Sequence, residues 1–336
     1  MKKMIAACLI VLLFGAVAHA EILEENDLRI EIEPMYLFRV ASSDYTMMYN
    51  NDSFRERSMA WRDFNSGNII NHSAMGVQGG LTWWFTESFG VELAGFWTDK
   101  ASSSCTVHDP VHFWGGSDLV YDQTPGKDFI TGNSSGLDVF EYTFETQLFG
   151  VEANLVGNFG EDLEWLEYFV GFRYIQYTED LSTTAYDEYH DYNGQDNDID
   201  WVGITSRNDL YGAQIGVDLE YELLEGLTVG SDAWFALFRN TVTVSRTFES
   251  ADVTGMLRDD SMSETNWAHG FGFSPELSYK PCDYVALTLG GDFMYLAGIS
   301  MSAAYFKTVS DLDDDILRPY DNVLYLGAHA GFVIFF

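Results

Sequence analysis

The sequence predicts an all-β protein, an antiparallel barrel whose strands cross a lipid bilayer. Three observations lead to this prediction: apolar residues recur at every second position over long stretches, the connections between these stretches alternate between long and short, and aromatic residues gather beside the short connections. The last segment shows the alternation clearly, because every second residue from Leu324 to Phe336 is apolar while Gly327, His329 and Gly331 fall between them.

Ten segments with this alternation are predicted as strands: residues 28–40, 73–86, 90–100, 143–159, 167–180, 207–222, 227–245, 267–280, 285–299 and 322–336. An alternative of twelve strands stays open, since Val111–Trp114 and Phe129–Thr131 could form a further hairpin within the longest connection. Closing the sheet into a barrel pairs every strand edge, which the backbone requires in lipid.

The predicted connections fall into two groups. The short ones are residues 87–89, 160–166, 223–226 and 281–284, and the long ones are residues 41–72, 101–142, 181–206, 246–266 and 300–321. A transmembrane barrel has this pattern, with short turns in the periplasm and long loops outside the cell. An even strand number then places both chain ends on the periplasmic side. A secreted β-sandwich or β-helix is the alternative, but strands of about 5–6 residues are usual there. The aromatic residues beside the short turns, expected at the membrane interface, are Trp83, Trp84, Phe85, Trp165, Tyr168 and Tyr284.

The first twenty residues predict export. Residues 1–20 begin with a basic pair, continue with an apolar stretch and end in Ala-His-Ala, which is typical of a secretory signal peptide. The mature chain is then expected to begin at Glu21, and residues 21–336 to form a single barrel domain in the bacterial outer membrane. No later window holds about 18 consecutive apolar residues, so no transmembrane helix is predicted.

The composition narrows the choice of partners. The chain has 52 Asp+Glu against 17 Lys+Arg, a formal net charge of −35, and such an acidic surface repels the phosphates of nucleic acids. Aromatic residues make up 16 %, too many for a disordered chain. The expected partners are outer-membrane lipid, small ions or solutes, and the barrel-assembly machinery, because the terminal Phe336 resembles the signature by which outer-membrane barrels are recognised.

Acidic residues outnumber basic ones on the predicted inward faces. This excess predicts a narrow, cation-biased, porin-like channel for small solutes or ions. The alternative is a plugged barrel with a structural or adhesive role carried by acidic surface loops, since a barrel of eight to ten strands is scarcely wider than its own side chains. The predicted inward acids are Glu31, Glu33, Glu92, Glu152, Glu179, Asp218, Glu220, Asp232, Glu276 and Asp292, and the inward bases are Arg29, Arg39, Arg173 and Lys280.

The long loops hold a candidate cation site. Asp196, Asp198 and Asp200 present carboxylates at alternate positions, an arrangement that suits a hard cation such as Ca²⁺. The spacing lacks the closing Glu of an EF-hand, so solvated anionic loops are the alternative. No other cofactor is predicted.

Catalysis is a third and weaker interpretation, and the chain is predicted not to be an enzyme. Some outer-membrane barrels are hydrolases, and Ser263 and His269 fall near one predicted rim, but their spacing fits no catalytic motif. His108 and His112 are separated by Pro110, which disfavours the helix that would place them together on a zinc ion.

Four segments carry a family resemblance: Val170–Tyr174 followed by Glu179, Arg207–Gly216, Glu276–Tyr279 and Gly327–Gly331. Through them, roughly residues 165–336 resemble the outer-membrane β-barrel porin family of planctomycete-type bacteria. The resemblance implies a porin-like barrel whose substrates are largely unassigned. No catalytic residue is implied by it, because no catalytic motif accompanies it.

Cys105 and Cys282 are predicted at opposite ends of the barrel, one in a long loop and the other in a short turn. The hydrocarbon core is about 30 Å thick, whereas a disulfide needs Cα atoms within roughly 7 Å. The two thiols are therefore not expected to bridge each other.

Overall fold

A computed structural model of the chain describes residues 28–40, 46–50, 64–65, 73–86, 88–108, 119–121, 139–159, 163, 165–186, 199–250, 256–303 and 320–336. The predicted signal peptide, residues 1–20, lies outside the described residues, as do Asp196 and Asp198 of the predicted cation site. Within the described part of the chain, no helix is long and apolar enough to cross a bilayer.

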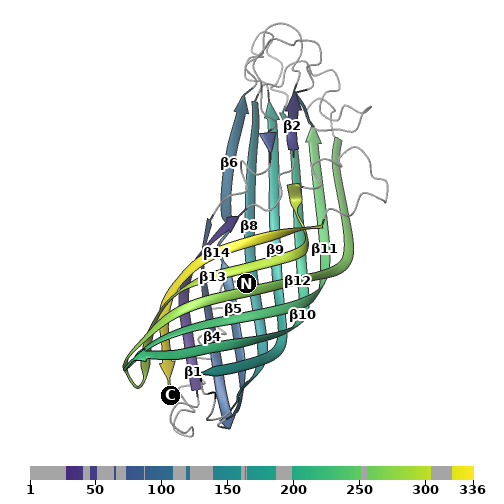
Figure 1. The fold of residues 1–336 in the computed structure, drawn as a ribbon. Helices are drawn as coiled ribbons and strands as arrows, with labels where there is room; N and C mark the ends of the chain where they lie inside the picture. Colours follow the sequence, from purple (N-terminus) through teal and green to yellow (C-terminus); the bar gives the residue numbers. More distant parts are fainter. Residues whose placement is uncertain are drawn as a thin grey trace, which may run out of the picture.

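Antiparallel strands dominate the described chain and close into a barrel (Figure 1). The barrel strands are β1 (Leu28–Val40), β4 (Ser73–Thr86), β5 (Phe89–Thr98), β6 (Ala101–His108), β8 (Val139–Asn158), β9 (Leu166–Tyr186), β10 (Ile199–Leu224), β11 (Leu227–Ser250), β12 (Met256–Cys282), β13 (Val285–Ser300) and β14 (Tyr320–Phe335). They are hydrogen-bonded in the order β5-β4-β1-β14-β13-β12-β11-β10-β9-β8-β6, and β5 closes the barrel by also pairing with β8. Since β5 and β6 pair with successive parts of β8, they form one interrupted strand, and the barrel has ten strands.

The predicted ten-stranded antiparallel barrel is confirmed, and β1 and β4 have the predicted bounds. The alternative of twelve strands is wrong, because ten strands already close the barrel, with β5 and β6 both paired directly with β8. The segments predicted for the further hairpin, 111–114 and 129–131, lie outside the described residues. Part of that long connection instead forms β7 (Leu119–Tyr121), which pairs with β2 (Thr46–Asn50) in a separate small sheet. The third strand of this sheet is β3 (Phe64–Asn65).

Several strands are longer than predicted and rise beyond the rest of the barrel (Figure 1). Parts of the predicted loops 101–142, 181–206 and 246–266 belong to these strands, so those loop boundaries are corrected. We call this part the upper barrel; it consists of residues 101–108, 139–148, 175–186, 199–210, 240–250 and 256–266.

Short turns join the strands at the opposite end, which we call the turn end. Gly226, in the turn between β10 and β11, has a φ of 74°, a left-handed conformation that glycine adopts without strain. The two ends of the barrel sequence also meet here, because the backbone N–H of Phe336 donates to the carbonyl of Leu28 at 3.0 Å. Cys282 is exposed at this end, whereas Cys105 lies in β6 of the upper barrel and not in a loop, and both thiols are free.

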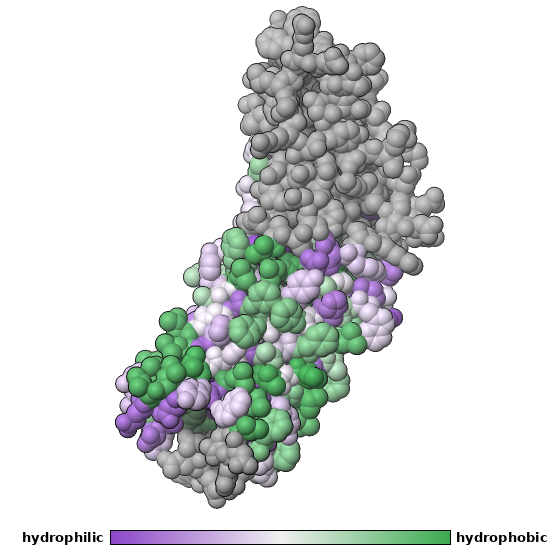
Figure 2. Space-filling view, in the orientation of Figure 1, coloured by the Kyte–Doolittle hydropathy of each residue, from purple (hydrophilic) through white to green (hydrophobic). Residues whose placement is uncertain are grey.

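Large apolar side chains cover the outside of the barrel between the turn end and the upper barrel (Figure 2). We call this surface the apolar belt; its exposed members include Tyr36, Phe38, Met75, Val77, Leu93, Val151, Leu155, Val170, Phe172, Ile215, Val217, Phe235, Leu237, Phe271, Phe273, Leu287, Leu289 and Leu326. Soluble monomeric proteins rarely expose so large an apolar surface to water, whereas the strands of a membrane barrel present such a surface to lipid tails.

The predicted aromatic residues beside the turns behave in two ways. Trp83, Phe85, Trp165 and Tyr284 are exposed on the outside, as residues at a membrane interface would be. Trp84 instead points inward and packs against the buried apolar side chains, so its predicted place at the interface is wrong.

The polarity of the two barrel faces reverses between the belt and the upper barrel. In the belt part of β11, Phe235 and Leu237 face outward while Asp232 faces the interior cavity. Further along the same strand, Val242 and Val244 are buried inside. The lower barrel therefore has apolar residues outside and a polar cavity inside, whereas in the upper barrel apolar side chains are buried inside together with polar ones such as Asn240 and Arg246.

Candidate functional site: an acidic cavity beneath an apolar plug

Inward-facing charged residues surround a cavity of about 260 Å³ inside the belt part of the barrel. We call it the acidic cavity; its charged and titratable lining residues are Arg29, Glu31, Glu33, Glu92, Glu152, Glu167, Arg173, Asp218, Glu220, Asp232, Glu276, Asp292 and His329. Its lining runs from buried residues such as Glu33 to Glu220, whose side chain is 54 % exposed, so the cavity opens toward the turn end.

The predicted lumen residues divide into three groups. Arg39 and Glu179 lie inside the barrel but above the cavity. Lys280 does not line the cavity: it is exposed at the turn end, where its Nζ lies 4.6 Å from the centre of the Phe335 ring. All the other predicted inward acids and bases line the acidic cavity. Glu167 lines it too but is absent from the prediction, although its even spacing from the inward residue Arg173 on the same strand places it on the inward face.

Ten carboxylates and two guanidinium groups line the cavity, so its charge is strongly negative when the acids are ionised. Arg173 donates from Nε to Glu152 Oε2 at 2.9 Å and lies 3.8 Å above the ring of Trp234. Arg29 lies 3.6 Å from Glu31 and 3.4 Å from Glu220. The remaining carboxylates have no guanidinium partner among the lining residues, and buried charge of this kind requires a proton or a cation.

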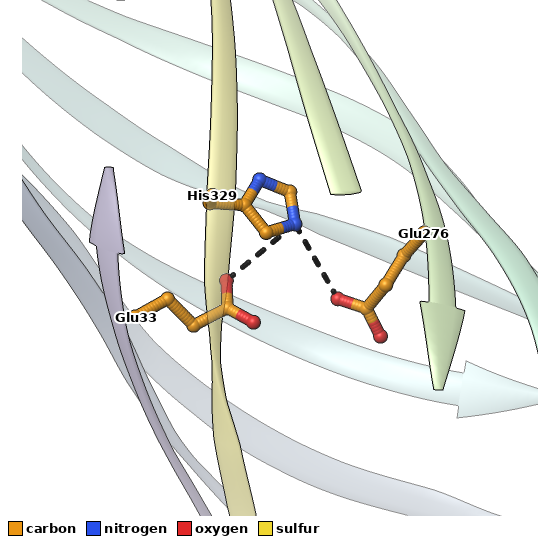
Figure 3. A group of neighbouring side chains, drawn as sticks. All are labelled: Glu33, Glu276 and His329. Carbon is orange, nitrogen blue, oxygen red and sulfur yellow. Dashed lines mark ion pairs between the residues drawn. The ribbon is translucent and has the colours of Figure 1, made fainter. Parts of the chain in front are cut away.

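His329 lies deep in this cavity between three acidic side chains. Its Nδ1 is 3.0 Å from Asp292 Oδ2. Its Nε2 is 3.6 Å from Glu276 Oε2 and 3.7 Å from Glu33 Oε2 (Figure 3). The two longer distances exceed those of hydrogen bonds. Nε2 is therefore a buried polar atom with no hydrogen-bond partner among the described residues.

Apolar side chains fill the barrel directly above the acidic cavity. Met35, Leu37, Trp234 and Met294 line the cavity and also belong to this cluster, which we call the apolar plug. Its buried members are Met35, Leu37, Leu148, Val156, Phe169, Ile175, Tyr177, Leu210, Trp234, Ala236, Phe238, Ala268, Met294, Leu296, Ile299, Met301, Val323 and Tyr325. These residues come from strands all around the wall, so the plug crosses the whole lumen.

The chain itself contributes to the plug where β13 ends. Gly298 has a φ of 79° and marks a register shift against β14, after which Ile299–Ala303 are almost completely buried. The carbonyl of Ser300 accepts hydrogen bonds from Ser206 Oγ at 2.9 Å and Asn208 Nδ2 at 2.8 Å, both on β10. Because β10 and β13 are not neighbours in the sheet, this segment is tied across the interior.

The remaining predicted site residues are not brought together. Asp200 belongs to β10 and not to a loop, so the predicted loop position is wrong for it. His108 ends β6, while His112 lies outside the described residues. Ser263 and His269 are both exposed on the outer face of β12, where they do not face the lumen.

The fold and the site together define a class of protein. A closed antiparallel barrel with an apolar outer belt and a polar interior at the same height is the architecture of β-barrels that span bacterial outer membranes.

Comparison with known proteins gives only distant likenesses. No family model matches the chain, and no curated protein matches it. The chain is similar in structure to the outer membrane protease OmpT from Escherichia coli, with 12 % identity and a TM-score of 0.41 over 94 % of this chain and 99 % of that one. The translocator domain of autotransporter NalP from Neisseria meningitidis has 10 % identity and a TM-score of 0.38 over 100 % and 98 %. A major outer membrane protein from Thermus thermophilus has 11 % identity and a TM-score of 0.31 over 91 % and 99 %. At these values, what those proteins do says nothing about what this chain does.

Proposed function

We propose that the protein is an integral outer-membrane barrel that is closed in the state described, with a structural or adhesive role at the cell surface. Of the two functions that the sequence predicts, the plugged barrel is therefore favoured over an open, cation-biased porin. The observation that carries the proposal is the apolar plug, which crosses the lumen above the acidic cavity. No catalytic activity is assigned to the barrel.

The plug opposes ion flow for two reasons. An ion that crosses the apolar side chains of the plug loses hydration, and the charged groups nearby, Arg39 and Glu179, are already paired with each other. The side chains of Ser206 and Asn208 also donate hydrogen bonds to the Ser300 carbonyl and hold this segment, with buried Met301 and Ala303, inside the lumen. A ten-stranded barrel is narrow enough for such side chains to fill it.

The outer surface supports the membrane location and the expected partners. The apolar belt is suited to contact with outer-membrane lipid. Phe336 would be the residue that the barrel-assembly machinery recognises. The strands of the upper barrel continue past the belt, so the end of the barrel that they form would lie clear of the membrane. Surface presentation of this kind fits an adhesive or structural role.

A second candidate function is a gated cation channel, and the acidic cavity favours it. Its surplus of carboxylates would attract cations and repel anions if the plug moved aside. The porin-family resemblance agrees with this candidate, and small ions or solutes would then be the transported species.

Single-channel recording in planar bilayers tests the proposal. The unmodified protein is expected to give no conductance steps. A variant with Phe238→Ala, Leu296→Ala and Met301→Ala removes plug side chains and is expected to give cation-selective steps. A matched control with Phe235→Ala, Leu237→Ala and Leu289→Ala removes similar volume from the outer face and should stay silent. Steady cation-selective steps from the unmodified protein would instead establish the channel function.

A further inference from the structure

We propose that Glu33, Glu276 and His329 bind one divalent transition-metal cation of the Zn²⁺ class inside the acidic cavity. This site goes beyond the proposed function, because it depends on the lower barrel alone and not on whether the plug is open or closed.

The three side chains converge from β1, β12 and β14 (Figure 3). Each offers one ligand atom, and these atoms lie within 4.8 Å of one another. Zn²⁺ binds imidazole nitrogen and carboxylate oxygen at about 2.1 Å, so two ligands at a tetrahedral angle lie roughly 3.4 Å apart. The observed separations from Nε2 of His329, 3.6 and 3.7 Å, are close to that value.

The orientation of His329 prepares Nε2 for a metal. Asp292 lies 3.0 Å from Nδ1, so this carboxylate can accept a proton from Nδ1 and leave Nε2, which lies near the two glutamates, free to bind a metal. Histidine ligands of metals usually have such a carboxylate or carbonyl behind them. The His329 side chain is 2 % exposed and Nε2 has no hydrogen-bond partner among the described residues, a costly arrangement unless a ligand occupies the gap.

Neighbouring residues also hold Glu33 in place. Gln78 donates from Nε2 to Glu33 Oε2 at 2.8 Å, and Thr288 Oγ1 donates to Oε1. Room for the imidazole comes from Gly290, where a Cβ atom would collide with the His329 ring. These contacts fix two of the three ligands before any cation arrives, which reduces the entropy lost on binding.

The charge of the cavity and its opening suit cation entry. Its carboxylates exceed its guanidinium groups by a wide margin, and the lining reaches exposed Glu220 at the turn end. One nitrogen and two carboxylate ligands match Zn²⁺ and related first-row ions, whereas Ca²⁺ takes six to eight oxygen ligands.

A protonated His329 that pairs with both glutamates is the competing arrangement. An N–H on Nε2 would be expected to approach one carboxylate to about 2.7–3.2 Å, and neither separation is that short. The experiment separates the two arrangements, because an ion-paired histidine binds no metal.

Titration of chelator-treated protein in detergent with Zn²⁺, followed by calorimetry, tests the site directly. We expect one Zn²⁺ per chain. His329→Gln and Glu276→Gln should each weaken binding at least 100-fold, and Asp292→Asn, a change at a positioning residue, should weaken it 10–100-fold. Asp218→Asn and Glu220→Gln are matched controls that remove charge from the same cavity and should change affinity less than about threefold.

Co²⁺ gives a second readout that loss of structure would not imitate. Bound Co²⁺ should show visible absorption bands of a four-coordinate site in the unmodified protein, changed by Asp292→Asn and absent in His329→Gln. Heat-dependent gel migration checks that each variant is folded. The proposal is overturned if the folded, unmodified protein binds no Zn²⁺, if the control variants weaken binding as much as His329→Gln, or if equimolar Ca²⁺ displaces Zn²⁺. None of these outcomes bears on conductance, so the two proposals fail separately.

Discussion

Arg39 on β1 and Glu179 on β9 form an ion pair of 2.7 Å across the barrel interior, although their strands are not neighbours in the sheet. Both side chains are at most 1 % exposed. Glu179 also accepts hydrogen bonds from the backbone N–H of Ser302 at 2.7 Å and from the hydroxyl of Tyr177, so the pair links β1, β9 and the segment after β13. Contacts of this ion pair with β1, β9 and the segment after β13 therefore hold the plug in place.

Removing one member of this pair should destabilise the barrel strongly. Arg39→Met leaves the Glu179 carboxylate buried without a counter-charge, a cost of about 3–5 kcal/mol. The double variant Arg39→Met/Glu179→Leu should recover part of the loss. Urea unfolding in lipid vesicles measures both. Lys100→Met breaks a 2.8 Å pair with Glu145 that is exposed, and should cost no more than about 1 kcal/mol; equal losses at the two sites would contradict the buried pair.

The apolar belt and the upper barrel should respond oppositely to charge on the outer face. Phe172, 73 % exposed in the belt, should face lipid, so Phe172→Arg is expected to cost about 2–4 kcal/mol. Thr178→Arg changes an outward residue six positions later on β9, in the upper barrel, and should be nearly neutral. Unfolding in vesicles compares the two variants. A large penalty at Thr178 would move the membrane boundary upward.

Chemical labelling of intact cells should distinguish the two ends of the barrel. Cys105→Ser leaves exposed Cys282 at the turn end, which a membrane-impermeant maleimide should reach only after the outer membrane is permeabilised. In a second variant, Cys105→Ser and Cys282→Ser remove both thiols and Ser104→Cys adds one on β6. This thiol should react on intact cells, because Ser104 is exposed in the upper barrel. Labelling of Cys282 without permeabilisation would reverse the assigned orientation.

Low pH should reduce the stability that Asp209 and its hydrogen-bond donors contribute just above the apolar belt. Burial works to raise the pKa of Asp209, but hydrogen bonds from Arg207, Tyr174 and Gln176 outweigh it and hold this pKa below its usual range. A lowered pKa stabilises the fold above the unfolded value, near 3.8, and the contribution disappears as pH falls through the folded value. Asp209→Asn should therefore lower stability at pH 7 by less than about 1 kcal/mol, because Arg207 is half exposed.

The matching measurement is urea unfolding of both proteins from pH 7 to pH 3. The difference between them should shrink toward pH 3. A difference that stays constant would show that the Asp209 charge does not contribute.

The sequence predicted the barrel well because period two survives in every strand. Where outward residues are apolar and inward ones small or polar, as in residues 324–336, the pattern is unmistakable, and the inward positions of Glu152 and Asp292 followed from it. The upper barrel was predicted only partly. There the outward residues are polar, as Thr241, Thr243 and Ser245 are on β11, and polar stretches of this kind are hard to tell from loops.

Two parts of the site could not be predicted from alternation. The plug was missed as a continuous layer because the prediction assumed one polar inward face along each strand, whereas Ala236 and Phe238 on β11 are inward and apolar. The meeting of Glu33, Glu276 and His329 depends on the register of three strands around a curved wall. Alternation shows which way a side chain points, but not which residue it faces across the lumen.

The reversal of polarity along each long strand has a consequence for strand register. A slip of one residue would turn every side chain to the opposite face. On β10 and β11 it would push Asp218 and Asp232 into lipid at one level and expose Val244 to water at another. The register of each long strand is therefore held by two separate free-energy costs, one for charged groups in lipid and one for apolar groups in water. A slipped register that lowered one of these costs would still incur the other.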